Sequence, residues 1–343
     1  MTNKVKVASL CTAGIAAIIL TAVVVSSAGS STGAVVAKRA SSDSRIKIAV
    51  VCATPQASSV FGPIEKGALA AGKAMGVSVT YTGVGPNNST PAGLVALITA
   101  AVNQHPSALV YCNAWPSAEN PIIKRAVKSG IAVFEFLNTP PKQYVGPKGI
   151  GPIAWTNGSN YNGGVQAGKA MAAAGVKHPV CVIHTVGNVS VEQRCKGFVK
   201  ALAAKGIHAT TLQLPLSAQN NITVFLNDVK GALEAHPNID GLFTQGPPQD
   251  TAAVQAVRAV GRAGKVKIGG FDMSPTVLAD IRSGAILFSM WQQPYLAGFV
   301  PVMEAALQAK YGMSPQGLVN LGPVVITKSN AGQLAKALAG GLL

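Results

Sequence analysis

Short β-branched runs alternate with alanine-rich stretches along most of the chain, and this alternation limits the fold more than any other feature. In the first half, the β-branched runs lie at 46–51, 77–81, 108–111 and 131–136. The stretches at 64–75, 93–102 and 121–128 have apolar residues at helical spacing, with Ile64, Ala68 and Met75 on one face of the first. Strand–helix–strand units at this spacing predict a parallel sheet, and the nearly continuous apolar strands predict that both its faces are buried.

The same order recurs in the second half of the chain. Strands are predicted at 180–185, 207–212, 239–244, 266–271 and 286–290, and helices at 191–204, 224–235 and 251–263. Local matches support a duplication, since Gln104-His105-Pro106 and Ala235-His236-Pro237 each close a helix before a strand. We therefore predict two similar α/β lobes, each a doubly wound parallel sheet.

The first 37 residues have the pattern of an export signal. Lys4 and Lys6 form a basic start, no charge follows until Lys38, and the stretch 7–25 is apolar. Small residues then offer cleavage points after Ala28 or Ala37. The apolar run is also about long enough to cross a bilayer, so residues 1–37 are read as a signal peptide or an uncleaved anchor, and 38–45 as a linker. The expected location is the periplasm or cell surface.

Composition and motifs narrow the function. The net charge of +16 arises from only 12 acidic residues, and no Lys/Arg-rich block occurs, so a nucleic-acid partner is not expected. Nucleophile-elbow, zinc-protease and Walker motifs are missing from the sequence, and the five histidines have no metal-ligand spacing. We therefore predict a protein that is not an enzyme and needs no metal or cofactor.

Cysteine usage leaves two pairings to consider. Cys52 and Cys112 end predicted neighbouring strands, so a disulfide between them is left open. Cys181 and Cys195 belong to one strand–helix unit, and we expect them to be two thiols or a weakly bonded pair. Five cysteines in a chain of this length do not indicate a disulfide framework.

Candidate binding residues follow the predicted strands, because ligands of doubly wound sheets bind at the carboxyl ends of the strands. The candidates are Ser58, Phe61, Asn113, Trp115 and Asn138 in the first lobe, and Arg194, Gln245, Asp272, Trp291 and Gln292 in the second. Amides, a carboxylate, a guanidinium and aromatic rings together suit a polyhydroxylated ligand. The alternatives are a surface position for Arg194, a helix cap at Asp272, and core positions for the tryptophans.

Three stretches resemble a known family. They are Ser58-Ser59-Val60-Phe61 with Gly67 beyond it, Arg194-Cys195-Lys196-Gly197-Phe198, and Gly269-Gly270-Phe271-Asp272 followed later by Gln292-Gln293-Pro294. Together they resemble the type I periplasmic binding proteins of sugar ABC transporters, the ribose-binding-protein-like group, over about residues 45–325. The resemblance implies that Arg194 grips sugar hydroxyls. Leu137-Asn138 and Gln245-Gly246 depart from charged pairs frequent in that family, which implies a less charged pocket.

The resemblance also implies an organisation and a role. Three crossings near 154–157, 290–293 and 321–324 would assign 46–156 and 293–321 to the first lobe and 157–292 and 322–343 to the second. The implied role is the solute receptor of an ABC importer, a monomer that closes on a sugar or polyol and docks on membrane permease subunits. A sensory protein that presents a small polar solute to a membrane receptor is the alternative.

Overall fold

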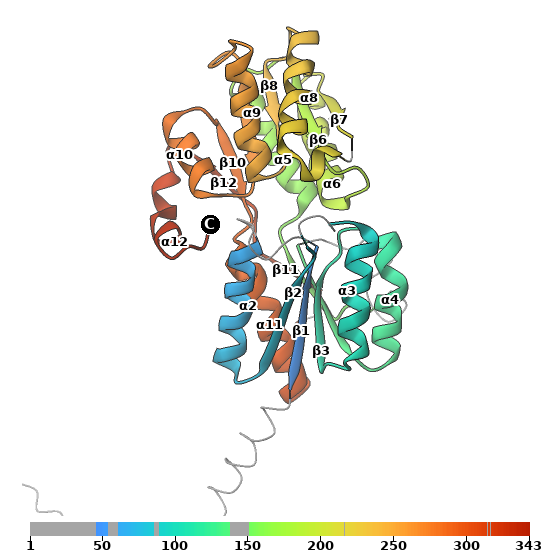
Figure 1. Cartoon of the computed structure of the whole chain (residues 1–343). Helices are drawn as coiled ribbons and strands as arrows, with labels where there is room; N and C mark the ends of the chain where they lie inside the picture. Colours follow the sequence, from blue (N-terminus) through green and yellow to red (C-terminus); the bar gives the residue numbers. More distant parts are fainter. Residues whose placement is uncertain are drawn as a thin grey trace, which may run out of the picture. The chain divides into compact units, whose positions relative to one another are not determined.

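The computed structural model describes residues 46–53, 61–85, 89–137, 151–215, 217–313, 315 and 317–343. The predicted leader and the candidates Ser58 and Asn138 lie outside these residues. Within them, the chain forms two six-stranded sheets, each covered by helices (Figure 1). Among the described helices, none combines the length and apolar character that a membrane crossing requires.

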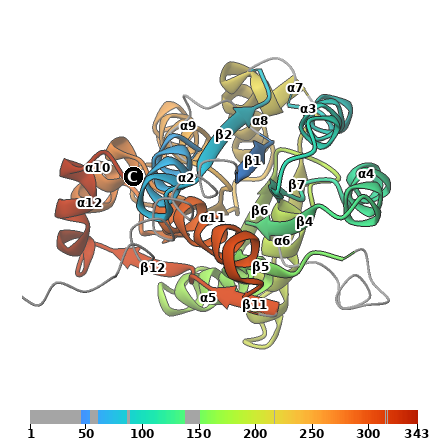
Figure 2. The same ribbon diagram turned by 90° about the horizontal axis from the view of Figure 1, so that it is seen from below.

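The first sheet is entirely parallel, with the strand order β11-β5-β4-β3-β1-β2. Its strands are β1 (Lys47–Cys52), β2 (Ser78–Gly83), β3 (Ala108–Cys112), β4 (Ala132–Phe136), β5 (Ala154–Asn157) and β11 (Gly317–Asn320). Its helices are α2 (Phe61–Met75), α3 (Pro91–Asn103), α4 (Pro116–Lys128) and α11 (Pro294–Tyr311). Helices α2 and α11 pack together on one face, and α3 and α4 on the other (Figures 1 and 2).

The second sheet repeats this winding, with the order β12-β10-β9-β8-β6-β7. Its strands are β6 (Pro179–Ile183), β7 (Thr210–Gln213), β8 (Gly241–Phe243), β9 (Lys267–Phe271), β10 (Phe288–Trp291) and β12 (Val324–Thr327). Only β12 runs antiparallel to its neighbour among these pairs. The helices are α5 (Asn160–Ala173), α6 (Val189–Ala203), α7 (Ser217–Asn220), α8 (Ile222–Ala235), α9 (Pro247–Ala259), α10 (Pro275–Ser283) and α12 (Ala335–Ala339), with the 3₁₀ turn η2 (Ala331–Leu334). The shared winding confirms the predicted fold class of two doubly wound lobes.

The chain passes between the lobes three times, as predicted. It leaves the first sheet after β5, returns from β10 into α11, and runs from β11 of the first sheet into β12 of the second. The crossings also contact one another. Gln293 Nε2 donates a hydrogen bond to the Leu321 carbonyl at 2.6 Å, and Gly158 lies so close to the Gly322 carbonyl that a Cβ would overlap with it.

Each lobe contains a pair of helices that approach closely through glycines. In the second lobe, a Cβ on Gly197 of α6 would overlap with the carbonyl oxygen of Tyr161 on α5. A Cβ on Gly164 of α5 would overlap in the same way with the Arg194 carbonyl on α6. Helices α2 and α11 of the first lobe repeat the arrangement with Gly67 and Gly298. The glycines therefore allow backbone-to-backbone packing, which fixes α6, and with it Arg194, against α5.

Aromatic side chains fill the core of the second lobe on the α5–α6 side of the sheet. Phe198 of α6 stacks on Phe243 of β8 with ring centroids 4.9 Å apart, and Phe271 and Phe288 complete the group. All four side chains are fully buried. Burial of this much aromatic surface makes the strand ends above it a rigid base for polar residues.

Candidate functional site

Arg194 lies in the interior of α6, a helix that Asn188 caps by accepting hydrogen bonds from the backbone N–H groups of Ser190 and Val191. Only 6% of the arginine is exposed, so the alternative of a surface arginine is wrong. Its Nε donates to Asn160 Oδ1 at 2.8 Å, and Nη1 donates to the Gln245 carbonyl at 3.4 Å. The helix thus carries a buried cation to the carboxyl ends of the strands.

Burial weakens the proton affinity of Arg194 without removing its charge. Desolvation lowers the pKa of the guanidinium to about 10, while the carboxylates of Asp272 and Asp250 act in the opposite direction. The group therefore stays cationic at neutral pH. Two of its five N–H donors are used by Asn160 and Gln245, so within the described part of the chain three remain for another partner.

Asp272 follows β9 in a left-handed backbone conformation, with φ of 71°. Its Oδ1 accepts a hydrogen bond from Gln292 Nε2 at 2.6 Å, and its backbone N–H donates to the Met290 carbonyl at 2.7 Å. The helix-cap alternative for Asp272 is wrong, because Ser274 caps α10 through Val277 N–H. Burial raises the pKa of the Asp272 carboxyl, although Arg194 and Gln292 both favour its charged form.

Gln245 follows β8 and connects the arginine to a disulfide. Its Nε2 donates to Cys181 Sγ at 3.2 Å, its carbonyl accepts from Arg194, and its Oε1 is buried with no hydrogen-bond partner among the described residues. Cys181 of β6 and Cys195 of α6 form a disulfide across 5.6 Å between Cα atoms. Of the two alternatives considered for this pair, two free thiols is therefore wrong, and the structure has the bonded pair.

The pairing left open in the first lobe does not form. Cys52 and Cys112 are both buried free thiols. Each sulfur has its own partner, since Cys52 Sγ bonds to Tyr81 Oη at 2.8 Å and Cys112 Sγ accepts from Ala53 N–H at 3.3 Å. Burial raises the pKa of both thiols, so they stay protonated.

Two of the first-lobe candidates, Asn113 and Trp115, form hydrogen bonds with buried glutamates that were not predicted from the sequence. Asn113 Nδ2 donates to Glu135 Oε2 at 3.4 Å, and Trp115 N–H donates to Glu119 Oε1 at 2.6 Å. Both carboxyls are fully buried, and desolvation raises the pKa of Glu119 to about 8 and that of Glu135 well above its ordinary range. The signal for Glu135 was an acid inside an otherwise apolar strand. Phe61 begins α2, and its carbonyl accepts from Tyr81 Oη.

The structure brings most second-lobe candidates into one cluster. Arg194 contacts Gln245 and lies over the Phe271 ring, beside which Asp272 bonds Gln292. Trp291 is instead half-buried and packs against the core of α8, α9 and α10. Asn160, which the sequence analysis missed, joins the cluster through Arg194; its position just after the first crossing was the available signal.

Two hydrogen bonds connect the residues after β3 and β4 with helices of the second lobe. Val189 N–H donates to the Ala114 carbonyl at 3.3 Å. Ala114 is the residue between the candidates Asn113 and Trp115 in the sequence. Asn160 Nδ2 donates to the Leu137 carbonyl at 3.1 Å. The candidate residues after β3 therefore lie next to the start of α6, the helix that carries Arg194.

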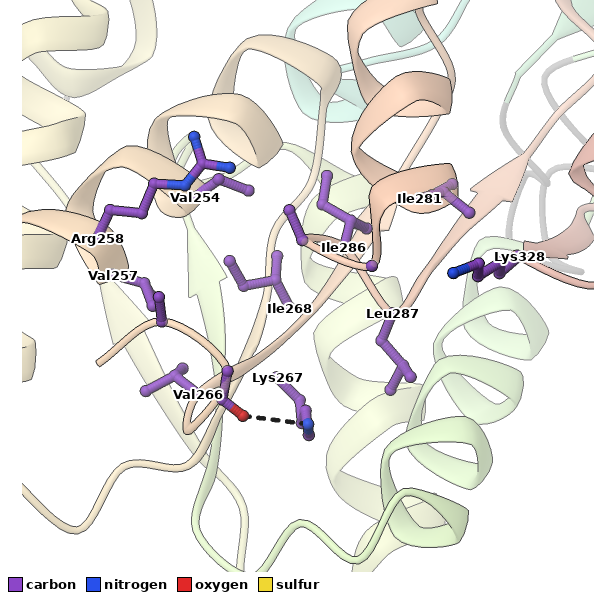
Figure 3. A pocket seen from close by; sticks show the side chains of 14 residues that line it. Val254, Val257, Arg258, Val266, Lys267, Ile268, Ile281, Ile286, Leu287 and Lys328 are labelled. Atoms are coloured by element: carbon purple, nitrogen blue, oxygen red, sulfur yellow. Dashed lines mark hydrogen bonds between the residues drawn. The ribbon is translucent and has the colours of Figure 1, made fainter. Parts of the chain in front are cut away.

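A separate cavity lies at the other end of the second lobe (Figure 3). It has a volume of about 220 Å³ and is lined mainly by aliphatic side chains with Arg258, Lys267 and Lys328 among them. Lys267 begins β9, whereas Asp272 follows its last residue. The cavity thus adjoins the amino ends of the strands and has none of the amide and carboxylate side chains found near Arg194. Among the described residues, no group of three or more His, Cys, Asp or Glu side chains is arranged to hold a metal ion.

Comparisons with known proteins agree with this architecture. The family model described as a periplasmic binding protein domain matches residues 48–312. The D-ribose/D-allose-binding protein of Pseudomonas aeruginosa is 30% identical over 182 residues, which cover 52% of this chain and 56% of that protein. The xylose/arabinose-binding protein of Sulfolobus acidocaldarius is 25% identical over 244 residues, 66% of this chain and 58% of that protein. The chain thus matches little more than half the length of these relatives.

Solved structures cover more of the chain. A carbohydrate transporter from Acidothermus cellulolyticus, in complex with myo-inositol, has a TM-score of 0.78 and 28% identity, covering 87% of this chain and 100% of that one. An ABC transporter solute-binding protein from Burkholderia graminis, in complex with D-arabinose, has a TM-score of 0.75 and covers 84% of this chain and 97% of that one. At 23% identity, the second likeness concerns the fold alone.

Proposed function

Because the chain belongs to the family of periplasmic binding proteins, we propose that it is the extracytoplasmic solute-binding protein of an ABC importer. Its ligand is a small neutral polyhydroxylated molecule, a sugar or polyol, bound between the two lobes. The chain carries out no reaction; it closes on the ligand as a monomer and delivers it to membrane permease subunits. Ligand binding shifts an equilibrium between open and closed arrangements of the lobes.

The observation that carries this proposal is the buried, incompletely bonded Arg194. A buried cation with unused donors is unfavourable unless a ligand supplies acceptors. Sugar hydroxyls can accept from Arg194 and donate to Asp272 at the same time, because a hydroxyl is both donor and acceptor. The sugars and myo-inositol bound by the similar proteins support the same ligand class.

The lobes and the leader complete the proposal. We assign 46–156 and 293–321 to the first lobe, and 157–292 and 322–343 to the second. Residues 1–37 act as a signal peptide or membrane anchor, followed by a linker at 38–45. Ser58, Phe61, Asn113, Trp115 and Asn138 would contact the ligand from the first lobe, and Arg194, Gln245, Asp272 and Gln292 from the second. Trp291 is not among these residues because it packs against the core of α8, α9 and α10.

A ligand screen tests the proposal. Thermal denaturation of the exported protein would be followed with D-ribose, D-allose, D-xylose, D-arabinose and myo-inositol, and with L-leucine and L-glutamate as solutes of another class. Binding stabilises the folded state by about 2.7 kcal/mol when the ligand is at a hundred times its Kd, so a true ligand raises Tm clearly. Stabilisation by an amino acid alone, or by none of the sugars and polyols, would contradict the proposal.

A further inference from the structure

We propose that the Cys181–Cys195 disulfide is a positioning element of the ligand site. It holds the Gln245 amide through a hydrogen bond and fixes the helix position next to Arg194. The inference rests on the proposed function. It says that a covalent bond, the disulfide, helps to orient residues that bind the ligand. Cys195 directly follows Arg194 in α6, and Cys181 lies in the centre of β6. The bond therefore attaches α6 to the sheet at the position of the arginine itself.

Gln245 is held by the disulfide through its amide group. Nε2 donates to Cys181 Sγ at 3.2 Å and lies 3.7 Å from Cys195 Sγ, and both sulfurs are buried. Sulfur is a weak acceptor. The two sulfur atoms of the disulfide therefore orient the Gln245 amide group better together than either would alone. With Nε2 directed at the sulfurs, Oε1 must point to the other side of the amide.

The disulfide would affect a ligand indirectly, through the orientation of Gln245 Oε1. Gln245 is 4% exposed, and its Oε1 has no hydrogen-bond partner among the described residues. A buried amide oxygen in this state is unfavourable unless a bound molecule supplies a donor. The Gln245 backbone carbonyl also accepts from Arg194 Nη1, so this residue is in direct contact with the guanidinium. A ligand hydroxyl can satisfy Oε1 by donating to it.

The general position of α6 does not depend on the disulfide. Gly164 and Gly197 already fix α6 against α5 through direct backbone packing. The disulfide adds a local constraint between α6 and β6, where Arg194 and Gln245 meet. Loss of the bond should therefore weaken ligand binding through side-chain orientation even in a molecule that remains folded.

The test compares wild-type protein with the C181S/C195S variant by isothermal titration calorimetry. The probes are D-ribose, D-xylose, D-arabinose and myo-inositol, at a temperature at which both proteins are folded. We expect the variant to bind at least tenfold more weakly than wild type. Val229→Ala in α8, a buried position outside the cluster, is the control that lowers Tm while leaving affinity unchanged.

A double-mutant cycle separates positioning from a general loss of stability. If the disulfide acts through Gln245, then Gln245→Ala weakens binding much less in the C181S/C195S background than in wild type. Equal effects of Gln245→Ala in the two backgrounds, or wild-type affinity in C181S/C195S, would overturn the inference and leave the proposed function standing. Failure of wild type to bind these four probes and D-allose as well would reject both.

Reduction of the wild-type protein keeps the test valid if the serine variant does not fold. Dithiothreitol gives two electrons and two protons to the disulfide, which becomes two thiols, and is itself oxidised to its cyclic disulfide. We expect reduced protein to bind at least tenfold more weakly, with affinity restored after reoxidation. Unchanged affinity after mass spectrometry has verified the two thiols would overturn the inference.

Discussion

The guanidinium carbon of Arg194 lies 3.5 Å from the centroid of the Phe271 ring, so this buried charge rests on an aromatic face. In the described part of the chain, no carboxylate oxygen lies within 4.0 Å of the guanidinium. Asp272 and Asp250 act on Arg194 only through longer-range electrostatics. The ring supports the cation without occupying its hydrogen-bond donors, which leaves them for a ligand.

Arg194→Lys should weaken ligand binding by about tenfold to a hundredfold. Lysine keeps the positive charge but loses the planar fork that bonds Asn160 and Gln245 and covers the Phe271 ring. Calorimetry with the sugar found in the ligand screen measures the change. Arg258→Lys, an exposed position on α9, is the matched control and should bind as wild type does. Equal affinities for the two variants would remove Arg194 from the site.

Asp272→Asn should lower affinity by about tenfold to a hundredfold with little change in the Tm of the unliganded protein. Asparagine tolerates the left-handed backbone at this position and can still accept from Gln292, but it lacks the carboxylate charge. Ser274→Ala is the counterpart. It removes the cap of α10, so it should destabilise the protein by about 1 kcal/mol and leave affinity unchanged. The opposite pattern would show that Asp272 serves the fold alone.

Glu119→Gln should stabilise the protein relative to wild type at pH 9 but not at pH 5. Burial raises the pKa of Glu119 from 4.5 to about 8, so the folded state binds more protons than the unfolded state between these values. Stability contributed by this group therefore falls as the pH rises through that interval. Glutamine can still accept from Trp115 N–H. Urea unfolding should show a gain of more than about 1.4 kcal/mol at pH 9, the equivalent of one pKa unit. The same difference at both pH values would contradict the assignment.

Gly197→Ala should destabilise the second lobe by roughly 1–3 kcal/mol or prevent its folding, because the new Cβ would overlap with the Tyr161 carbonyl. Gly231→Ala makes the same chemical change at an exposed position of helix α8, where a Cβ has open space. It should raise stability by up to about 1 kcal/mol, since alanine is the better helix former. Urea unfolding of the two variants measures the contrast, and similar values would show that α5 and α6 separate easily.

Export should remove or expose the leader. We expect mass spectrometry of the exported protein to find a chain that begins near Gly29 or Lys38, or an intact membrane-associated chain if the leader stays as an anchor. An intact Met1 on protein confined to the soluble cytoplasmic fraction would contradict the export proposal.

Strand and helix positions could be predicted wherever a strong apolar pattern is local in sequence. The run 108–111 corresponds to β3, and the helical stretch 224–235 corresponds to α8. Helix α5 and strands β11 and β12 were not predicted, because α5 is rich in glycine and alanine and the two strands have four residues each. Helix α4 begins at Pro116 rather than Pro121, since the Trp115 carbonyl accepts from Ala118 and Glu119 and forms an earlier first turn.

In the candidate site, too, residues with a local sequence signal could be predicted and residues that depend on tertiary contacts could not. Arg194, Gln245 and Asp272 could be proposed because each follows a recognisable strand or lies in a recognisable motif. The buried partners of the site, Asn160 and the two glutamates, depend on which elements meet in three dimensions. The cysteine pairing could not be decided from the sequence for the same reason. Strand order brings Cys52 near Cys112, but Tyr81 and Ala53 engage their sulfurs, whereas docking of α6 on β6 joins the other pair.

The contacts among the three crossings have a mechanical consequence. Gln293 is bonded to the Leu321 carbonyl, and Gly158 lies against Gly322, so the three connecting segments form one narrow bundle instead of three separate tethers. A bundle of this kind resists sliding and shear between the bodies that it joins, but it allows them to rotate about a common axis through the bundle. We therefore expect the molecule to have essentially one soft degree of freedom, in which torsions at a few residues swing two stiff bodies along a reproducible arc.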